Sequence, residues 1–390
     1  MVLGRMEPLG TERVALAQAR GRVLAEDVAA RVDLPVWDQS AMDGYALRAE
    51  DVAGATAATP ASLHCVAETP AGSVFGGKVG ASQCVRVFTG TPLPAGTDAV
   101  VMQEDTRCTE STVLVSEIVR PWENIRLRGE DVRAGETVLS RGTRLSAVTM
   151  GLLAAQGVER LEVCQIPSVA LIATGNELRE AGVALGPGEI HESNRLMLGG
   201  MLAADGLRAA TQPIVADRLD ATCAALEHAA TTCEAVITIG GASVGRHDLV
   251  RPALEALGGA MHFWKVAIKP GKPFCFGTLS GKPVFGLPGN PVSALVTYLL
   301  LVRPALLRLA GASDLALPSH PARLGEALFN HGDRRHFMRV RMDEAGTAWA
   351  TGLQSSHALR GLAGACGMVD VPPGALLAMG ATVTVLRWPC

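Results

Sequence analysis

Residues 262–293 read HFWKVAIKPGKPFCFGTLSGKPVFGLPGNPVS, and this stretch holds the strongest signals for both the fold and a functional site. Apolar runs typical of strands flank a Pro-Gly turn that carries Lys269 and Lys272. Further along, the segment GLPGNPVS at 286–293 turns a strand sharply into a long apolar helix. The stretch therefore predicts two ammonium groups in a turn close to a strand–helix junction.

The start of that helix adds a second feature. Asn290 suits the N-cap position and Pro291 the first helical turn, so unpaired backbone N–H groups would point outward there. Ammonium groups that face a helix N-terminus predict a site for a small oxyanion or a phosphate. Taken alone, KPGKP is also compatible with two surface lysines beside an ordinary strand–helix junction.

Composition limits the class of protein. A chain of 390 residues is long enough for roughly two to four domains. Hydrophobic residues make up 48% and charged residues 19%, which is typical of a globular protein. The net charge of −3 gives no electrostatic signal for nucleic acid or an anionic membrane as a partner. An anion site must therefore be a local cluster of charges.

Cysteine usage and apolar runs predict a cytoplasmic protein. The nine cysteines lack CxxC or Cys/His zinc spacing, which favours reduced thiols over a disulfide framework. The first residues, MVLGRMEPLGTERVALAQ, lack the apolar core of a signal peptide. The apolar run Val292–Val302, which Arg303-Pro304 ends, is too short to span a bilayer, and we expect a buried helix.

The residue pattern of the N-terminal part changes twice, from helical periodicity to strand-like runs and back. Residues 11–30 carry apolar residues at helical spacing and predict an amphipathic helix, and residues 132–165 return to that periodicity. Short Val/Thr/Ala runs between Pro-Gly turns fill the segment between them. We therefore predict a helical, elongated unit from 1–32 and 132–165, into which a β-rich domain of residues 33–131 is inserted.

The remainder predicts an α/β domain and a second β domain. Residues 166–312 alternate between strand and helix patterns, which implies a mostly parallel sheet covered by helices. Residues 313–390 are strand-like with Gly/Pro turns and predict a small β domain. The fold class is thus multidomain α/β plus β. Ligands of such sheets bind beyond the carboxyl ends of the strands, where Thr174–Glu177 and Gly240–Gly245 fall.

Three carboxylates follow strands of the predicted sheet. Glu177, Asp217 and Asp248 are placed to converge at one sheet edge, where they would suit a hard cation such as Mg²⁺. The loop GGASVG, which includes Ser243, would allow close approach to a phosphate or a ring. It is not a P-loop, because no Gly-Lys-Ser/Thr follows. Each carboxylate is equally explained as a helix cap or a solvated turn residue.

Other polar motifs lie in the flanking domains. Asp43 stands in WDQSAMDGYA, where Asp-Gly also fits a simple hairpin corner. In DRRHFMR, a strand would place Arg335, Phe337 and Arg339 on one face, where guanidinium groups suit an oxyanion, although a solvated basic strand fits as well. Of the dispersed histidines, His247 and His357 are the two that merit testing.

An ordered series of motifs carries a family resemblance. SAMDGYA, TGTPLPAG, DAVVMQED, IRLRGEDV, ATGNEL, SNR, GGASVG, KPGKPFCFG and GLPGNPVS follow one another across residues 40–293. Together they resemble the molybdopterin molybdenumtransferase family, which includes the gephyrin E domain. The resemblance covers nearly the whole chain and fades after about residue 360.

The resemblance implies a transferase of molybdenum cofactor biosynthesis. Such an enzyme takes adenylylated molybdopterin and molybdate and releases AMP, with Mg²⁺ assisting. It also implies a homodimer, in which each active site lies between the α/β domain of one subunit and the inserted β domain of the other. A molybdopterin adenylyltransferase is a possible partner.

The resemblance also implies site residues. Those implied as catalytic are Asp43, Thr89, Asp131, Asp248, Lys265, Lys269 and Lys272. Those implied to bind substrate are Glu177, Asp217, Ser243, Pro288, Pro291, Ser293, Arg335, Arg339 and Ser356. Glu177, Asp217 and Asp248 are the implied metal ligands.

The chain departs from the family pattern at several points. The opening helix is shorter than is usual, His191-Glu192 replaces the usual Tyr-Asp, and Arg246-His247 stands where many members carry an acidic residue. Alternatives therefore remain: a scaffold or binding protein of the same fold without turnover, a molybdopterin carrier or sensor, or a generic nucleotide-binding enzyme.

Overall fold

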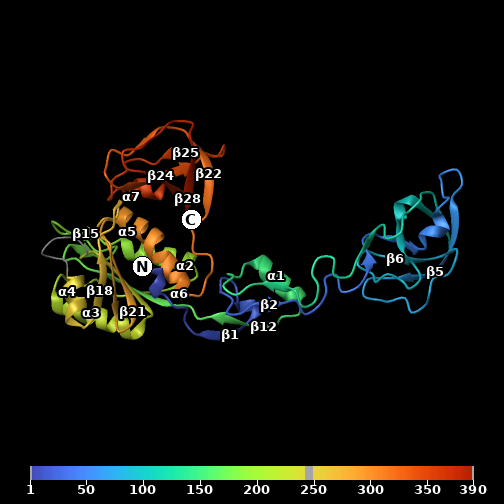
Figure 1. Ribbon diagram of the computed structural model, residues 1–390, viewed down its shortest axis with the longest axis horizontal. Coiled ribbons are helices and arrows are strands. Elements are labelled where there is room, and N and C mark those ends of the chain that lie inside the picture. Colours follow the sequence, from blue (N-terminus) through green and yellow to red (C-terminus); the bar gives the residue numbers. More distant parts are fainter. Residues whose placement is uncertain (1, 242–248, 389–390) are drawn as a thin grey trace. The chain divides into compact units, whose positions relative to one another are not determined.

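The computed structural model describes residues 2–241 and 249–388 of the chain. The chain divides into two compact units (Figure 1). Unit 1 comprises Met1–Glu26, Arg141–Gly151 and Glu159–Cys390, and unit 2 comprises Asp27–Ser140 and Leu152–Val158. The finer division into four domains stays a prediction.

A six-stranded sheet organises the middle of unit 1, in the order β16-β13-β17-β21-β20-β18. Its strands are β13 Ser168–Ala173, β16 Arg208–Thr211, β17 Ala235–Ile239, β18 Ala260–Trp264, β20 Cys275–Leu279 and β21 Lys282–Leu287. β13 pairs in parallel with β16 and β17, and β17 pairs in parallel with β21. β20 runs antiparallel to β21, because the tight turn at Ser280-Gly281, with φ values of 52° and 77°, makes a hairpin of the two. β18 completes the sheet as an antiparallel partner of β20. The predicted mostly parallel sheet is confirmed.

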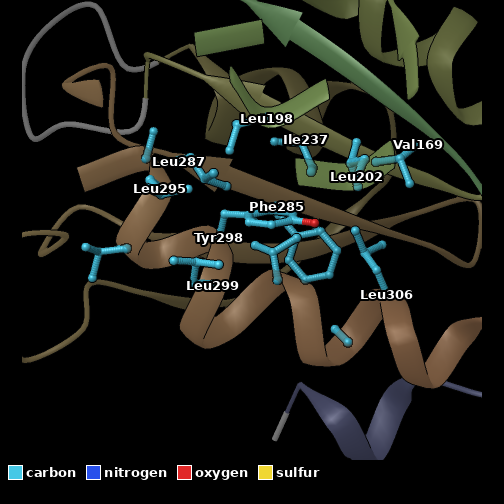
Figure 2. Close-up of a cluster of buried hydrophobic side chains, with 14 of the residues drawn as sticks. Val169, Leu198, Leu202, Ile237, Phe285, Leu287, Leu295, Tyr298, Leu299 and Leu306 are labelled. Carbon is cyan, nitrogen blue, oxygen red and sulfur yellow. The ribbon is translucent and has the colours of Figure 1, made fainter. Parts of the chain in front are cut away.

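Helices cover both faces of this sheet, and strand alternation explains why. Val169 and Leu171 of β13 join one buried cluster, whereas Ala170 and Ile172 join the other. The first cluster packs under α2 Asn194–Ala204, α5 Pro291–Thr297 and α6 Arg303–Leu309, and the second under α3 Leu219–Thr232 and α4 Val250–Ala256. Figure 2 shows Leu295, Tyr298 and Leu299 facing the sheet residues of the first cluster.

The buried helix predicted from the apolar run 292–302 is confirmed, and it extends beyond Arg303-Pro304, where the run ends. It continues from α5 through a π-helical segment, Tyr298–Val302, into α6. The Arg303 N–H donates to the Tyr298 carbonyl, five residues earlier, so this wider turn lets the chain pass Pro304. Within the described residues, Pro291–Leu309 is the one helix long and apolar enough to cross a membrane, but 78% of its apolar window is buried inside the protein. It is a core helix.

The helix predicted over residues 11–30 is wrong. The segment forms strand β1 Thr11–Ala15, a 3-10 turn Leu16–Gln18 and strand β2 Val28–Ala29. β1 pairs antiparallel with β12 Arg160–Cys164, and β2 pairs with β11 Thr137–Leu139. These long-range pairings override the helical spacing, which Gly21, with a φ of 78°, interrupts. Of the helical pattern in residues 132–165, α1 Ala147–Ala155 is the part that forms a helix.

The C-terminal part of unit 1 is a β structure, as predicted. A six-stranded sheet runs in the order β19-β24-β25-β22-β28-β26. Its strands are β19 Ile268–Lys269, β22 Ser319–Leu324, β24 Arg335–Met342, β25 Thr347–Ala350, β26 Gly367–Val371 and β28 Thr382–Arg387. The short strands β23 Leu328–Phe329 and β27 Leu376–Leu377 pair with each other, and α7 spans Leu359–Ala363. Because β19 comes from the KPGKP segment, it ties that turn directly to β24.

Unit 2 holds a six-stranded sheet in the order β7-β4-β6-β5-β9-β8. Its strands are β4 Gly44–Leu47, β5 Ala61–Thr69, β6 Gln83–Val87, β7 Ala99–Met102, β8 Thr106–Thr109 and β9 Thr112–Val115. The short strands β3 Gln39–Ser40 and β10 Ile125–Arg126 form a separate pair. At Gly44 a Cβ atom would lie 1.9 Å from the Val101 carbonyl oxygen, so the motif SAMDGYA needs glycine there. The β-rich character predicted for this segment is confirmed.

Candidate active site

A cavity of about 480 Å³ lies at the carboxyl ends of β13 and β17. We call it the carboxylate cavity. Its lining residues are Ala173, Thr174, Gly175, Glu177, Leu178, Ile190, Glu192, Asn194, Asp217, Ile239, Gly240, Gly241, Gly289 and Asn290. This is where ligands bind to sheets of this type, and where the sequence placed the loops after the strands.

Two of the predicted metal ligands, Glu177 and Asp217, line this cavity. The loops that carry them are joined, because Asp217 Oδ2 accepts the Asn176 N–H at 3.3 Å while Asn176 Oδ1 accepts the Asp217 N–H at 3.1 Å. Gly240 adopts a φ of 89°, and a Cβ there would lie 2.7 Å from the Thr174 carbonyl oxygen. The glycine therefore lets two strand ends approach closely at the cavity floor.

Glu192 is the third acidic residue of the cavity wall, and it is fully engaged. Its carboxylate accepts the N–H groups of Asn194 and Arg195 at 2.7 and 3.0 Å, and also the Nε–H of Arg195 at 2.9 Å. It therefore caps the start of α2, although Ser193 holds the N-cap position and makes no side-chain cap bond. His191, in the same departure from the family pattern, contacts the Val183 carbonyl at 2.8 Å.

The donor set of the carboxylate cavity suits Mg²⁺ in part. Mg²⁺ prefers oxygen ligands and is often held by one or two carboxylates together with substrate phosphates and waters, which Glu177 and Asp217 match. Across residues 2–241 and 249–388, no group of three His, Cys, Asp or Glu side chains is close enough to hold an ion. The third predicted ligand, Asp248, lies outside the described residues, as do Ser243 and His247.

A second cavity, of about 540 Å³, is lined by cations and hydroxyl groups. We call it the lysine cavity. Its lining residues are Lys269, Pro270, Gly271, Lys272, Pro273, Pro288, Asn290, Ser293, Arg334, Gln354, Ser355, Ser356 and His357. Three basic side chains and, among the residues that the structure describes, no carboxylate share this wall, so its potential favours an anion. Lys269, Lys272, Pro288, Ser293 and Ser356 were all predicted site residues.

The arginine of the lysine cavity is Arg334, one residue before the predicted Arg335. The Arg334 guanidinium lies at the cavity wall and donates to the Ile268 carbonyl at 3.0 Å. Arg335 begins β24 and pairs with Asp370, with Nε to Oδ2 at 2.9 Å. Since that ion pair draws its guanidinium to β26, Arg335 lines neither cavity.

Arg339 also lies behind the wall and not in it. It is 1% exposed, and its guanidinium donates to the carbonyls of Leu353 and Ser355 at 2.5 and 3.3 Å. Burial lowers the pKa of Arg339. Gln354 adds two bonds, accepting the Arg339 N–H and donating to the Arg339 carbonyl, both at 2.9 Å. Arg339 therefore fixes the loop that carries Ser355, Ser356 and His357 to the cavity.

His336 forms a buried neighbour of this cationic group. It pairs with Lys269 across β19 and β24 and is 4% exposed. Burial, followed by the positive charges of Lys269, Arg339 and Arg334, lowers the pKa of His336 to about 4. The ring is therefore neutral at physiological pH.

Two other predicted residues lie apart from both cavities. The Lys265 ammonium sits over the Trp264 ring, 4.5 Å from its centre, and Lys265 has a φ of 73°. Pro291 occupies the first turn of α5 as predicted but lines neither cavity. The sequence predicted unpaired backbone N–H groups at the start of α5. One of them, that of Val292, is paired, because it donates to the Ser356 carbonyl at 3.0 Å.

In unit 2, Asp43 and Thr89 are brought together. Asp43 Oδ1 accepts the Thr89 N–H at 2.8 Å and the Thr89 hydroxyl at 2.9 Å. These bonds lower the pKa of Asp43, the backbone N–H more than the hydroxyl. Asp131 lines a separate cavity of about 440 Å³ with Trp37 and Arg126.

Comparison with known proteins decides the family. Three family models match successive parts of the chain: "MoeA N-terminal region (domain I and II)" over residues 1–157, "Probable molybdopterin binding domain" over 170–308, and "MoeA C-terminal region (domain IV)" over 321–388. The molybdopterin molybdenumtransferase 2 of Mycobacterium tuberculosis is 39% identical over 365 residues, which cover 92% of this chain and 90% of that protein. The chain belongs to the molybdopterin molybdenumtransferase family.

Further relatives of this family agree. The molybdopterin molybdenumtransferase of Haemophilus influenzae is 38% identical over 314 residues, covering 80% of this chain and 76% of that one. A crystal structure of the molybdopterin biosynthesis moeA protein from Pyrococcus horikoshii superposes with a TM-score of 0.86 at 30% identity, over 99% of this chain and 97% of the other. The expectation that the resemblance fades after about residue 360 is wrong, because the match of the C-terminal region extends to residue 388.

Sequence reasoning missed several residues of the two cavities. Thr174 and Asn194 stand in the motifs ATGNEL and SNR but had received no role, and Asn290 had been read as a helix cap alone. Arg334 and Ser355 adjoin predicted residues. The available signal was position: Thr174 and Asn194 stand inside family motifs, and the other three each adjoin a predicted site residue.

Proposed function

We propose that this member of the molybdopterin molybdenumtransferase family inserts molybdenum into adenylylated molybdopterin, with release of AMP. The observation that carries the proposal is the lysine cavity, in which Lys269, Lys272 and Arg334 share a wall with no carboxylate from residues 2–241 or 249–388. Such a wall suits molybdate, a small tetrahedral dianion, and disfavours a neutral or cationic ligand. The adjoining carboxylate cavity would take the organic substrate.

Charge stabilisation is the chemistry that these residues can supply. Cleavage of the adenylate places negative charge on the departing phosphate oxygens, and fixed ammonium groups lower the energy of that transition state. Glu177 and Asp217, with Asp248, would hold Mg²⁺, which supplies further charge neutralisation at the phosphates when it is bound. Asp43, Thr89 and Asp131 of the β-rich insert would complete the active site from a partner subunit.

The homodimer in this proposal is supported by α1. Its sequence, AVTMGLLAA, has no charged residue, yet Leu153 is its one buried side chain within the described chain. Val148 is 83% exposed. An uncharged helix whose residues are mostly apolar is normally covered, and a second copy of the chain would cover it. We further propose a cytoplasmic location and transfer of substrate from a molybdopterin adenylyltransferase.

The test is molybdate-dependent release of AMP from adenylylated molybdopterin by the purified protein, with Lys269→Ala, Lys272→Ala and the double variant. Loss of a group that stabilises developing charge should lower the rate about 100-fold to 1,000-fold. Lys269→Arg, which keeps the charge, should retain more activity than Lys269→Ala. A double variant that turns over at the wild-type rate would contradict the proposal.

The same assay separates the alternatives. A scaffold or carrier of this fold would bind molybdopterin without releasing AMP. A generic nucleotide-binding enzyme would release product without depending on molybdate. Repeating the assay with Glu177→Gln and Asp217→Asn across a Mg²⁺ titration tests the metal, since loss of a ligand should raise the Mg²⁺ concentration needed for half-maximal rate.

A further inference from the structure

Asn290 belongs to both cavities. Among the described residues it is the one side chain that lines the carboxylate cavity and the lysine cavity alike. A ligand in either cavity therefore lies beside the same residue. The proposed function needs both cavities filled at once, so the bonding of Asn290 bears directly on how the two ligands influence each other.

Asn290 does not use its side chain as a helix cap normally would. It holds the N-cap position of α5, with φ −67° and ψ 128°, but makes no side-chain cap bond. Such a bond usually stabilises a helix. Its Nδ2 instead donates to the Ser356 hydroxyl at 3.1 Å, and the Ser356 carbonyl accepts the Val292 N–H that needs a partner. Ser356, from a distant part of the chain, thus caps the helix in place of Asn290. The Asn290 side-chain amide can therefore bond to Ser356 at the boundary between the two cavities.

The Ser356 end of this connection is held firmly. Four hydrogen bonds between Arg339 and residues 353–355 fix the loop directly before Ser356, and Arg339 is almost fully buried. A shift of Ser356 that carries Ser355 with it would have to break the bond between the Ser355 carbonyl and a desolvated guanidinium, which is costly. Movement at Asn290 is therefore passed to the hydroxyl groups of the lysine cavity and is not lost in a loose loop.

The other end reaches the carboxylate cavity through Asn194. Its Nδ2 donates at 2.7 Å to the carbonyl of Gly289, the residue before Asn290. Asn194 is 8% exposed, and its Oδ1 has no hydrogen-bond partner in the part of the chain that the structure describes. An unsatisfied buried acceptor of this kind gains a bond when a ligand that presents an N–H or O–H group displaces its cover and reaches it. Thr174 Oγ1, in the same wall, likewise has no hydrogen-bond partner among the described residues.

We propose that the series Asn194, Gly289, Asn290 and Ser356 couples the two cavities, so that an organic substrate in the carboxylate cavity raises the affinity of the lysine cavity for molybdate. A ligand that donates to Asn194 Oδ1 fixes its amide, the Gly289 carbonyl and hence the Asn290–Ser356 bond. Asn290 is in this scheme a positioning residue. The inference rests on the proposed function, since it assigns one substrate to each cavity. By linkage, molybdate must raise the affinity for the organic substrate by the same factor.

The experiment measures the dissociation constant of molybdate by calorimetry under anaerobic conditions, with and without saturating molybdopterin. Molybdopterin lacks the adenylate, so no AMP release disturbs the titration. The wild type should bind molybdate about fivefold or more tightly when molybdopterin is present. Asn290→Ala and Ser356→Ala should each reduce that factor below about twofold, and the double variant should reduce it no further, because both remove one bond.

Two matched variants separate coupling from general damage. Ser356→Thr keeps the hydroxyl and should keep the factor. Ser355→Ala removes a neighbouring hydroxyl of the same wall that takes no part in the series, so it should also keep the factor, whatever it does to the affinity itself. A wild-type factor near one, or a factor that survives Asn290→Ala and Ser356→Ala, overturns the inference while leaving AMP release by the wild type untouched. A wild type that binds no molybdate refutes the proposed function instead.

Discussion

Arg334 and Arg335 are adjacent in sequence but have different surroundings. Arg334 lines the lysine cavity, whereas Arg335 is paired with Asp370. Arg334→Ala should weaken molybdate binding about 10-fold to 100-fold, as expected when a charged hydrogen bond is lost. Arg335→Ala should change the affinity less than threefold. Calorimetry on the two variants checks this, and a larger loss from Arg335→Ala would show that the guanidinium leaves Asp370 to reach the ligand.

His336 should make stability depend on pH. Its folded pKa, about 4, lies below the value near 6.5 of an unfolded histidine, so the unfolded chain binds more protons between these two values. The stabilisation is therefore complete above about pH 6.5 and is lost as the pH falls toward 4. Between pH 7 and pH 5 the free energy of unfolding should drop by about 2 kcal/mol on this account.

The check for His336 is urea denaturation at both pH values for the wild type and for His336→Gln, which cannot titrate. The variant should show a pH-dependent drop smaller by that amount. Equal drops in the two proteins would mean that His336 is protonated without cost, and hence that it is less desolvated than the fold indicates.

At the level of single residues, much of the site was predictable. The turn and the helix start predicted an anion site, and their residues Lys269, Lys272 and Ser293 do line one cavity. Arg335 was chosen over Arg334 because alternation fixes which residues share a face of a strand. It does not fix where the loop before the strand leads. Nor does the sequence show that Asp370 forms its ion pair with Arg335.

Among the elements, α2, α6 and the π segment meet at a buried ion pair. Asp205 and Arg303 are 4% and 6% exposed, their side chains approach to 2.9 Å, and the Tyr298 hydroxyl donates to Asp205 at 3.2 Å. Asp205→Asn should lower the free energy of unfolding by about 3–5 kcal/mol, because it leaves a buried guanidinium without its counter-charge.

The exposed pair Arg251–Glu255 of α4 serves as the control for that variant. Both of its side chains are 55% exposed, so Glu255→Gln should cost no more than about 0.5 kcal/mol. Urea denaturation of both variants gives the comparison. Equal effects would show that water reaches Asp205.

Elements were predictable where local pattern and tertiary contact agree. Much of the α/β core follows hydrophobic periodicity, since the central strands β13, β17 and β21 are buried on both faces and α2, α3 and α4 on one. Residues 11–30 failed because β1 is defined by its partner β12, which lies far away in sequence. Periodicity within a segment carries no information about such a partner.

At the scale of the whole molecule, the dimer is the property that one substitution can test. Val148→Glu places a charge on the exposed apolar face of α1 and should convert a dimer into monomers in sedimentation velocity at micromolar concentration. Leu376→Glu makes a comparable change at another exposed aliphatic residue, 63% accessible, and should leave the dimer intact. A wild-type monomer, or an unaffected Val148→Glu dimer, would remove α1 from the interface.

The π segment also restricts how the length of this chain can vary. The segment holds one residue more than an α-helical turn, so deleting one residue between Tyr298 and Val302 would give ordinary α-helical bonding and leave Arg303 facing Asp205. A deletion in α5 would instead rotate everything after it by about 100° about the helix axis. Arg303 would then turn away from Asp205 and from the Leu315 and Ala316 carbonyls it holds, where the chain leaves for β22. We therefore expect single-residue deletions to be tolerated in the π segment and in surface loops but not in α5.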